Sequence, residues 1–390
     1  MPQSDSGFSF RVTHRDGEAR AGEIGTPHGV VRTPAFAPVG TRGAVRGLTH
    51  RDVAGLGAEL VLANTYHLHL RPGARLVARS GGLHRFIGWD RPILTDSGGY
   101  QVFSLGDRRT IDEDGVSFRS HLDGSRQRLT PESATDIQAR LGSDVAMAFD
   151  ECTSYPVSEP EAEASMRRTL GWARRCRARF LAFRDDPGSL HGEVTNPGQA
   201  QFGIVQGGVY DRLRAASARE TVALGFEGYA IGGLSVGEPV DVMYRVVGGT
   251  AALLPDDRVR YLMGTGMPDD LVECVAAGID LFDCVLPTRN ARNGQLLTRE
   301  GPLSIKRAEF AEDARPPDPG CSCYTCRRYS RAYLRYLHVA GEMAGRTLNT
   351  LHNLHFYLDT MRRMRNAILF GTFESFRQRF HETFSRRPRS

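Results

Sequence analysis

Lysine is almost missing from this chain. Lys306 is the only lysine among the 50 lysine and arginine residues, so nearly all of the positive charge belongs to arginine. The base composition of the genome is the main explanation for such a bias. The bias also favours a surface that binds phosphates or stacks on bases, because the guanidinium group is planar, always charged and fork-shaped.

Long hydrophobic runs are also absent. No apolar stretch reaches the roughly 18 residues that a membrane helix needs. Residues 1–6 lack the basic start and the apolar block of a secretory signal. We therefore expect a cytoplasmic protein with no membrane association.

The seven cysteines do not suit a disulfide framework, because their number is odd and most of them are scattered. Cys321, Cys323 and Cys326, however, lie within six residues. Three thiolates in one tight turn indicate a structural zinc site, which needs a fourth ligand to complete its tetrahedron. His352 and His355 are both candidates, since residues at i and i+3 share a helix face. An iron–sulfur cluster is the alternative.

No Gly-x-Gly-x-x-Gly follows the first apolar run, which weakens a dinucleotide-binding interpretation. Instead, short apolar runs alternate with helix-like segments, and this pattern predicts a parallel α/β fold. Eight strands are the number that closes a (β/α)8 barrel, with an open doubly wound sheet as the alternative. A hairpin around Asp16-Gly17 precedes the pattern as a cap. The eight runs are residues 34–39, 59–63, 92–95, 144–149, 202–205, 228–231, 260–263 and 279–282.

Polar residues and glycines follow six of these predicted strands. In a barrel the carboxyl ends of the strands meet on one face, where the active site lies. Asp96, Asp150 and Asp283 would then share that face, and two carboxylates on one face can divide acid/base and nucleophilic roles at a sugar. Caps and ion pairs are the ordinary alternative for any single aspartate.

Arginines follow the last of these strands directly, at Arg289 and Arg292. A second basic segment, residues 324–336, interleaves arginines with tyrosines. Arginine neutralises phosphates and tyrosine stacks on bases, so both segments are candidates for RNA binding. A solvated helix face is the ordinary alternative for the second segment, and a contact with another subunit is a further one.

At this point the residues resemble a known family, the bacterial tRNA-guanine transglycosylases, over essentially the whole chain. The matching stretches are residues 95–101 (TDSGGYQ), 149–153 (FDECT), 203–207 (GIVQG), 230–234 (AIGGL), 261–266 (YLMGTG), 283–289 (DCVLPTR), 292–294 (RNG), 321–326 (CSCYTC) and 352–354 (HNL).

The resemblance implies an irregular (β/α)8 TIM barrel with an N-terminal β-hairpin or sheet cap at residues 1–310. It also implies an inserted zinc-binding subdomain at 311–365, followed at 366–390 by a final barrel helix and a basic tail that we expect to be disordered. The implied reaction exchanges guanine at the wobble position of tRNAs with a G-U-N anticodon (Asp, Asn, His and Tyr) for the free base 7-aminomethyl-7-deazaguanine, in queuosine biosynthesis. Relatives are homodimers.

The resemblance also assigns roles to residues. It makes Asp283 the nucleophile at ribose C1′ and Asp96 the general acid/base. The base-binding set comprises Asp150, Gln206, Gly233 and the main chain of Leu234, with Tyr100 and Met263 as the walls of the purine site. Arg289 and Arg292 resemble the readers of the uridines beside the wobble base, and Cys321, Cys323, Cys326 and His352 resemble the ligands of one structural Zn2+ per subunit.

The departures from the family pattern are small. Ala291 stands where glycine is common, and Ser235 stands where alanine often occurs. Two other functions compete with this one. A barrel glycoside hydrolase accounts for Asp96 and Asp283 but not for the cysteine cluster or the arginines. A non-catalytic RNA-binding subunit accounts for the cysteines but predicts loss of the nucleophile, which this chain retains.

Overall fold

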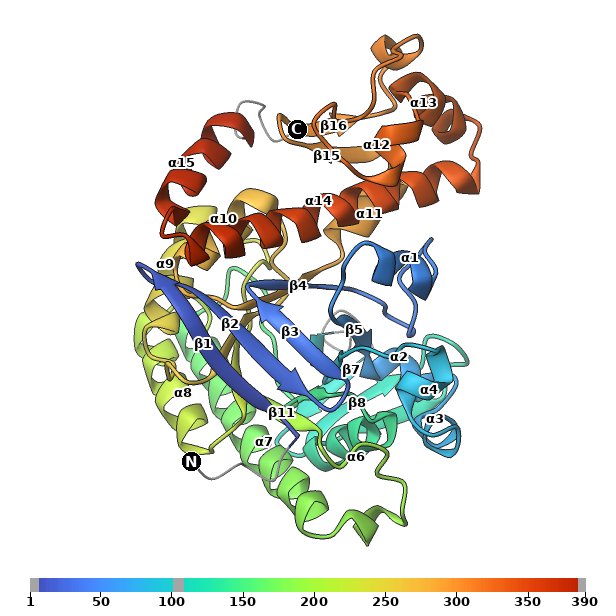
Figure 1. Ribbon diagram of the computed structural model, residues 1–390. Coiled ribbons are helices and arrows are strands. Elements are labelled where there is room, and N and C mark those ends of the chain that lie inside the picture. Colours follow the sequence, from blue (N-terminus) through green and yellow to red (C-terminus); the bar gives the residue numbers. More distant parts are fainter. Residues whose placement is uncertain (1–6, 101–108, 385–390) are drawn as a thin grey trace.

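The computed structural model describes residues 7–100 and 109–384 (Figure 1). Its centre is a sheet of eight parallel strands in the order β4-β14-β13-β12-β11-β10-β6-β5. The two end strands meet through a parallel bridge between Val39 and Leu62, so the sheet closes into a barrel. The predicted barrel is therefore confirmed, and the open sheet is excluded. The strands are β4 (Ala35–Pro38), β5 (Val61–Asn64), β6 (Ile93–Asp96), β10 (Val145–Met147), β11 (Ala200–Val205), β12 (Gly228–Ile231), β13 (Val259–Leu262) and β14 (Leu281–Cys284).

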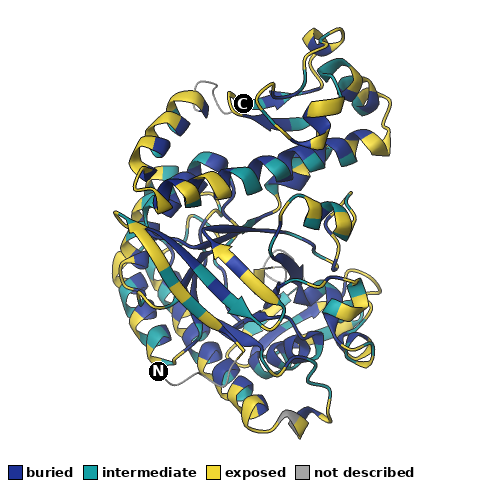
Figure 2. Ribbon diagram, viewed as in Figure 1, coloured by how far each residue is buried: buried dark blue, intermediate teal, exposed yellow. Residues whose placement is uncertain are grey.

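Helices surround this barrel, and their inner faces are buried while their outer faces are exposed (Figure 2). Thr130 caps the helix that begins at Pro131, and this proline occupies the first turn. The helices between the strands are α1 (His50–Gly55), α2 (Thr65–Leu70), α3 (Ala74–Arg79), α4 (Leu83–Ile87), α6 (Pro131–Leu141), α7 (Glu159–Asp185), α8 (Asp211–Ala223), α9 (Val240–Ala251) and α10 (Pro268–Ala276), with a 3-10 turn at Pro187–Leu190.

An antiparallel sheet covers the amino-terminal end of the barrel, in agreement with the predicted cap. It consists of β1 (Ser9–Asp16), β2 (Ala19–Thr26) and β3 (Gly29–Thr33). Phe8, Ile24 and Val31 are buried together with the inward-facing side chains of the barrel strands. The Phe8 ring meets the Phe202 ring edge-on at 5.6 Å between centroids. The cap therefore covers the apolar interior at the amino-terminal end of the barrel, and the polar side chains lie at the opposite end.

A second small sheet, which the sequence did not predict, lies between β6 and β10. It comprises β7 (Arg109–Asp112), β8 (Gly115–Arg119) and β9 (Arg126–Leu129). The Asp112 carboxylate accepts hydrogen bonds from the amides of Asp114 and Gly115 and so holds the first turn. These strands are short and rich in arginine, so the apolar alternation that identifies a half-buried strand is weak here.

The chain after β14 forms a separate layer on the barrel. It contains α11 (Leu286–Arg292), β15 (Gln295–Thr298), β16 (Gly301–Ser304), a 3-10 turn at Ala308–Phe310, α12 (Tyr324–Arg328), α13 (Arg331–Val339), α14 (Met343–Leu369) and α15 (Phe373–Phe384). Gly341, at φ +76°, adopts a left-handed conformation that separates α13 from α14.

Helix α14 runs without interruption from the small sheet of this layer to the barrel wall (Figure 1). Its first half carries His352, and its second half packs Met361, Met364 and Ile368 into the outer core of the barrel. The division of the chain at residues 310 and 365 stays a prediction. Gln101 of the 95–101 motif and the tail at 385–390 lie outside the described residues. Within the described ranges, every helix is too short or too polar to cross a bilayer.

Candidate active site and metal group

Three aspartates lie at the carboxyl ends of barrel strands. Asp96 is the last residue of β6, Asp283 lies next to the end of β14, and Asp150 follows β10. Because all eight strands run parallel, these ends meet on one rim. Burial, followed by the charges of Asp283 and Asp96, raises the pKa of Tyr261 well above its ordinary value, so both carboxylates act on one buried hydroxyl.

Asp283 is held by one of its two carboxylate oxygens. The Tyr261 hydroxyl donates to Oδ1 at 2.6 Å, and the amide of Gly264 donates to the same oxygen at 3.0 Å. Burial raises the pKa of Asp283, and these two hydrogen bonds oppose the rise. Oδ2 has no hydrogen-bond partner among the described residues. One oxygen is thus anchored while the other is left for a substrate.

Asp96 is buried and fixed by the junction of β5 and α2. Asn64 Nδ2 donates to Asp96 Oδ2 at 2.6 Å, and the amide of Thr65 donates to Oδ1 at 3.1 Å. The Thr65 hydroxyl donates to the Asp96 main-chain oxygen. Sequence reasoning missed Asn64 and Thr65, although polar residues directly after the apolar run at 59–63 were a usable signal.

Asp150 forms a buried pair with Gln206. Gln206 Nε2 donates to Asp150 Oδ2 at 2.8 Å, and Ser97 Oγ donates to Oδ1 at 3.4 Å. Burial raises the pKa of Asp150 to about 6 against these hydrogen bonds. Gly233, at φ +69°, makes room for the pair, because a Cβ there would lie 2.3 Å from Gln206 Oε1. Carboxylate, amide and open backbone together form a set of donors and acceptors suited to the edge of a purine.

The other predicted rim residues follow strand ends of the same face. Leu234 is buried after β12, Met263 is partly buried after β13, and 55% of Tyr100 is exposed after β6. Arg289 is exposed on α11, directly after β14, and Arg292 is half-buried there. All of them therefore follow the carboxyl ends of barrel strands, the end that carries the three aspartates.

The predicted cysteines converge with His352. The distances from His352 Nδ1 to the sulfurs of Cys321, Cys323 and Cys326 are 3.9, 3.4 and 3.3 Å. A tetrahedral zinc with bonds of about 2.3 Å to sulfur and about 2.1 Å to nitrogen spaces such ligands about 3.5 Å apart. His352 Nε2 is 2.7 Å from the main-chain oxygen of Leu297, which leaves Nδ1 as the coordinating nitrogen. This donor set fits a tetrahedral metal ion.

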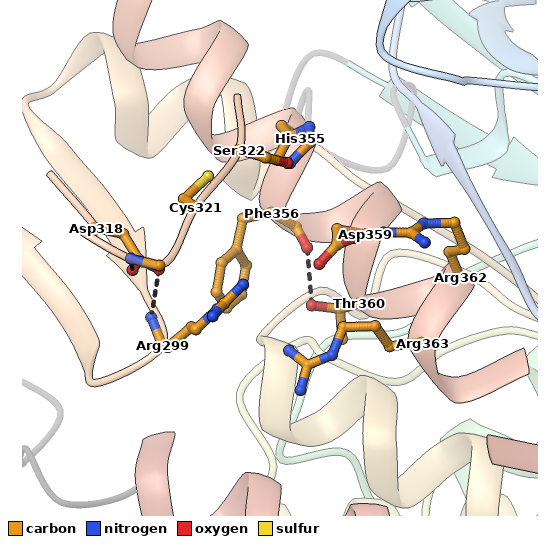
Figure 3. Close-up of a pocket in the computed structure, with 11 residues that line it drawn as sticks. Arg299, Asp318, Cys321, Ser322, His355, Phe356, Asp359, Thr360, Arg362 and Arg363 are labelled. Carbon is orange, nitrogen blue, oxygen red and sulfur yellow. Dashed lines mark hydrogen bonds and ion pairs between the residues drawn. The ribbon is translucent and has the colours of Figure 1, made fainter. Parts of the chain in front are cut away.

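His355, the other candidate for the fourth ligand, is not part of this group. It lines a cavity of about 250 Å³ beside the metal group, together with Cys321, Arg299 and Arg363 (Figure 3). This cavity contains none of the rim residues.

A second histidine–carboxylate group, also missed by sequence reasoning, lies at the opposite end of the barrel. His28 Nδ1 and His84 Nε2 approach separate oxygens of Asp144, at 2.7 and 3.0 Å. The two imidazole rings are stacked 3.5 Å apart and 11° from parallel. These two hydrogen-bonded pairs connect the cap, α4 and the start of β10.

Barrel enzymes carry their active sites at the carboxyl rim, and this chain has the carboxylates and the buried polar pair of such an enzyme there. Comparison with known proteins identifies the family. The profile of the family described as queuine tRNA-ribosyltransferase matches residues 16–386. The chain is 52% identical to the queuine tRNA-ribosyltransferase of Moorella thermoacetica over 97% of this chain and 98% of the relative. It is 53% identical to that of Sphingopyxis alaskensis, over 97% and 99%. The chain belongs to the queuine tRNA-ribosyltransferase family, whose members are pentosyltransferases.

Proposed function

We propose that this protein exchanges the guanine at the wobble position of G-U-N tRNAs for 7-aminomethyl-7-deazaguanine, through a covalent ribosyl–aspartate intermediate. The observation that carries this proposal is the pair of rim carboxylates with different surroundings. Asp283 has one free oxygen in a partly exposed position, whereas Asp96 is buried and held at both oxygens.

In the first displacement, Asp283 Oδ2 attacks ribose C1′ and the bond from C1′ to guanine N9 breaks. The Tyr261 and Gly264 donors favour the ionised form of Asp283 and fix the orientation of its carboxylate. The departing guanine carries negative charge, and Asp96 delivers a proton to it. In the second displacement, Asp96 accepts a proton from the incoming base, whose N9 attacks C1′ and releases Asp283. Two displacements retain the configuration of the sugar.

Base recognition falls to the buried pair. An ionised Asp150 accepts hydrogen bonds from the N–H groups on the Watson–Crick edge of guanine, and the same edge exists on the deazaguanine. Gln206 and the amide of Gly233 face the carbonyl of that edge, and the main-chain oxygen of Leu234 accepts from the aminomethyl group. Tyr100 and Met263 enclose the ring. The target nucleotide lies in an anticodon loop, so unstacking it costs only about a few kcal/mol.

The metal ion in this proposal is zinc with a structural role, because three sulfurs and one imidazole leave no open position for a substrate. We also propose a cytoplasmic homodimer. Tyr324, Tyr333 and Tyr336 expose large aromatic surface on α12 and α13, as a subunit contact needs.

The test is trapping of the covalent intermediate. The wild-type enzyme is mixed with an anticodon stem-loop in the absence of incoming base, quenched and separated under denaturing conditions. Asp283→Ala should give no RNA adduct and no exchange of labelled guanine, while bound zinc and thermal unfolding stay unchanged. Asp280→Asn is not a suitable control, because the Asp280 carboxylate pairs with buried Arg20. Asp241→Asn on the outer helix α9 is suitable and should retain the adduct. An adduct that persists in Asp283→Ala would remove Asp283 from this role.

A further inference from the structure

Arg214 differs from the other buried arginines of this protein. It lies on α8, which packs against β11, and it is only 2% exposed. It forms no ion pair with a described residue. A buried charge without a counter-ion is costly, because it has lost its water and has gained no ion pair in exchange. The three other buried arginines of the described residues all have carboxylate partners, in the pairs Arg20–Asp280, Arg177–Glu227 and Arg260–Asp256.

Two main-chain oxygens hold the Arg214 guanidinium in place. Nε donates to the main-chain oxygen of Gly208 at 2.8 Å, and Nη1 donates to that of Val205 at 2.9 Å. Val205 ends β11 and Gly208 belongs to the turn that follows it. Nη2 is buried and has no hydrogen-bond partner among the described residues. The guanidinium is therefore fixed, and Nη2 is the end whose hydrogens are left over.

This free end lies beside the base-binding pair of Asp150 and Gln206. A Cβ at Gly233 would lie 2.3 Å from Gln206 Oε1 and 3.7 Å from Arg214 Nη2, so both atoms lie on the same side of Gly233. A Cβ at Gly232 would instead lie 2.7 Å from Gln206 Nε2, the atom that donates to Asp150 Oδ2 at 2.8 Å. The Gln206 carboxamide thus has its nitrogen toward a carboxylate and its oxygen on the side of a guanidinium.

Both charges act on this part of the rim. Burial lowers the pKa of Arg214 to about 10, and the charges of Cys152 and Glu238 oppose the shift, so the group is a cation at neutral pH. Burial raises the pKa of the Cys152 thiol to about 12. The charge of Asp150 adds to this rise and that of Arg214 opposes it. One buried thiol therefore lies within the field of the carboxylate and of the guanidinium.

We propose that Arg214 is a positioning residue that fixes the orientation of the Gln206 carboxamide and thereby selects bases with a carbonyl at position 6. This proposal rests on the proposed function and specifies how its base site distinguishes a carbonyl from an amino group. The oxygen and the nitrogen of a carboxamide are similar in size, so packing alone does not decide which way the group faces. A cation on the oxygen side and a carboxylate on the nitrogen side favour one orientation.

The fixed orientation gives the site its donor. One hydrogen of Gln206 Nε2 is used by Asp150, and the second is left for the 6-carbonyl of the base. A base with a 6-amino group would bring a donor against this donor, and both would stay unpaired in a buried site. An unpaired buried polar group is costly, and a site of this kind discriminates strongly between a carbonyl and an amino group.

The test compares the affinities of two free bases, guanine and 2,6-diaminopurine, measured by calorimetric titration at neutral pH. In Arg214→Gln, which removes the charge and keeps a hydrogen-bond donor, the preference for guanine should fall about tenfold. Arg214→Lys retains a cation and should restore part of that preference. Arg260→Gln is the matched control, because Arg260 is also buried but lies at the other end of the barrel strands, where it donates to the main-chain oxygen of Leu254. It should keep the wild-type preference.

A second variant leaves Arg214 in place and decides the question if Arg214→Gln does not fold. Gln206→Glu puts a second carboxyl group beside Asp150, and the neighbouring guanidinium should keep that group ionised. A carboxylate cannot donate to a 6-carbonyl, so this variant should lose the preference for guanine. A retained preference would mean that the new carboxyl is protonated despite Arg214, and this result would overturn the proposal.

The outcomes also separate this proposal from the proposed function. If the wild-type enzyme exchanges no base into RNA, the proposed function fails. If it does exchange base and Arg214→Gln keeps the wild-type preference, only the role of Arg214 fails. Equal weakening of both bases in Arg214→Gln would likewise overturn the proposal, because a purely structural role predicts a loss of affinity without a loss of discrimination.

Discussion

Tyr261 offers the sharpest test of how the barrel prepares its nucleophile. In β13 it lies opposite Leu281 of β14, and residues 281 and 283 point to the same side of their strand. Its hydroxyl therefore reaches Asp283 Oδ1 at 2.6 Å. Tyr261→Phe removes one hydrogen bond to a charged group, an interaction of about 1.5 to 3 kcal/mol. If that interaction serves the reacting carboxylate, kcat should fall about tenfold to a hundredfold, at about 1.4 kcal/mol for each factor of ten.

The pH dependence of kcat should also change in Tyr261→Phe, in a direction that follows from the pKa of Asp283. The Tyr261 hydrogen bond lowers the pKa of Asp283 against the effect of burial, so its loss raises that pKa further. The acid limb of the kcat profile should move to higher pH, and the defect should shrink as the pH rises. KM for RNA should not change.

Tyr229→Phe is the matched control for this variant. Tyr229 is a buried tyrosine on the neighbouring strand β12, and its hydroxyl donates to the main-chain oxygen of Val222 at 3.2 Å, away from the rim. It should cost some stability and leave the pH profile in place. Equal kcat and coincident pH profiles for Tyr261→Phe and the wild type would refute the reasoning.

Three further predictions follow from the site. Burial raises the pKa of Asp150 to about 6, and base binding needs the ionised form of this carboxylate. The affinity for free guanine, measured by calorimetric titration, should therefore rise as the pH increases through about 6. Asp150→Asn should lose both the affinity and its pH dependence. Cys323→Ser should lose bound metal, measured by elemental analysis, together with thermal stability, whereas Cys274→Ser, buried on α10, should retain the metal. Gly233→Ala should raise KM for the base by at least tenfold and leave the metal content normal. The reason is that φ is +69° and the new Cβ would lie 2.3 Å from Gln206 Oε1. A normal KM would show that the backbone at this position shifts to accept a side chain.

The barrel strands could be predicted from the sequence, because each strand is a short apolar run that is buried on both faces. The polar residues at its carboxyl end follow directly in the sequence, so they could be predicted with it. Seven of the eight predicted runs contain most or all of an observed strand, and the run at 279–282 contains half of β14. The aspartates that follow these runs lie on the rim. The β7–β9 sheet was not readable, because its strands carry arginines on exposed positions and little apolar alternation. The boundary between α13 and α14 shows the same limit, since the left-handed Gly341 that separates them resembles any other glycine in the sequence.

The sequence by itself determined the barrel, the three carboxylates and the cysteine triplet. Periodic apolar runs predict buried strands, and three closely spaced cysteines predict ligands of one metal ion. Only the tertiary structure decided which side chains serve them. Asn64 and Thr65 hold Asp96 across two strands, and Tyr261 holds Asp283 across another pair. The residue pattern alone left His352 and His355 open, and the long helix α14 brings His352, which the family resemblance had named, to the three sulfurs. Such partners are fixed by strand register and helix packing, which join residues that no spacing in the sequence relates.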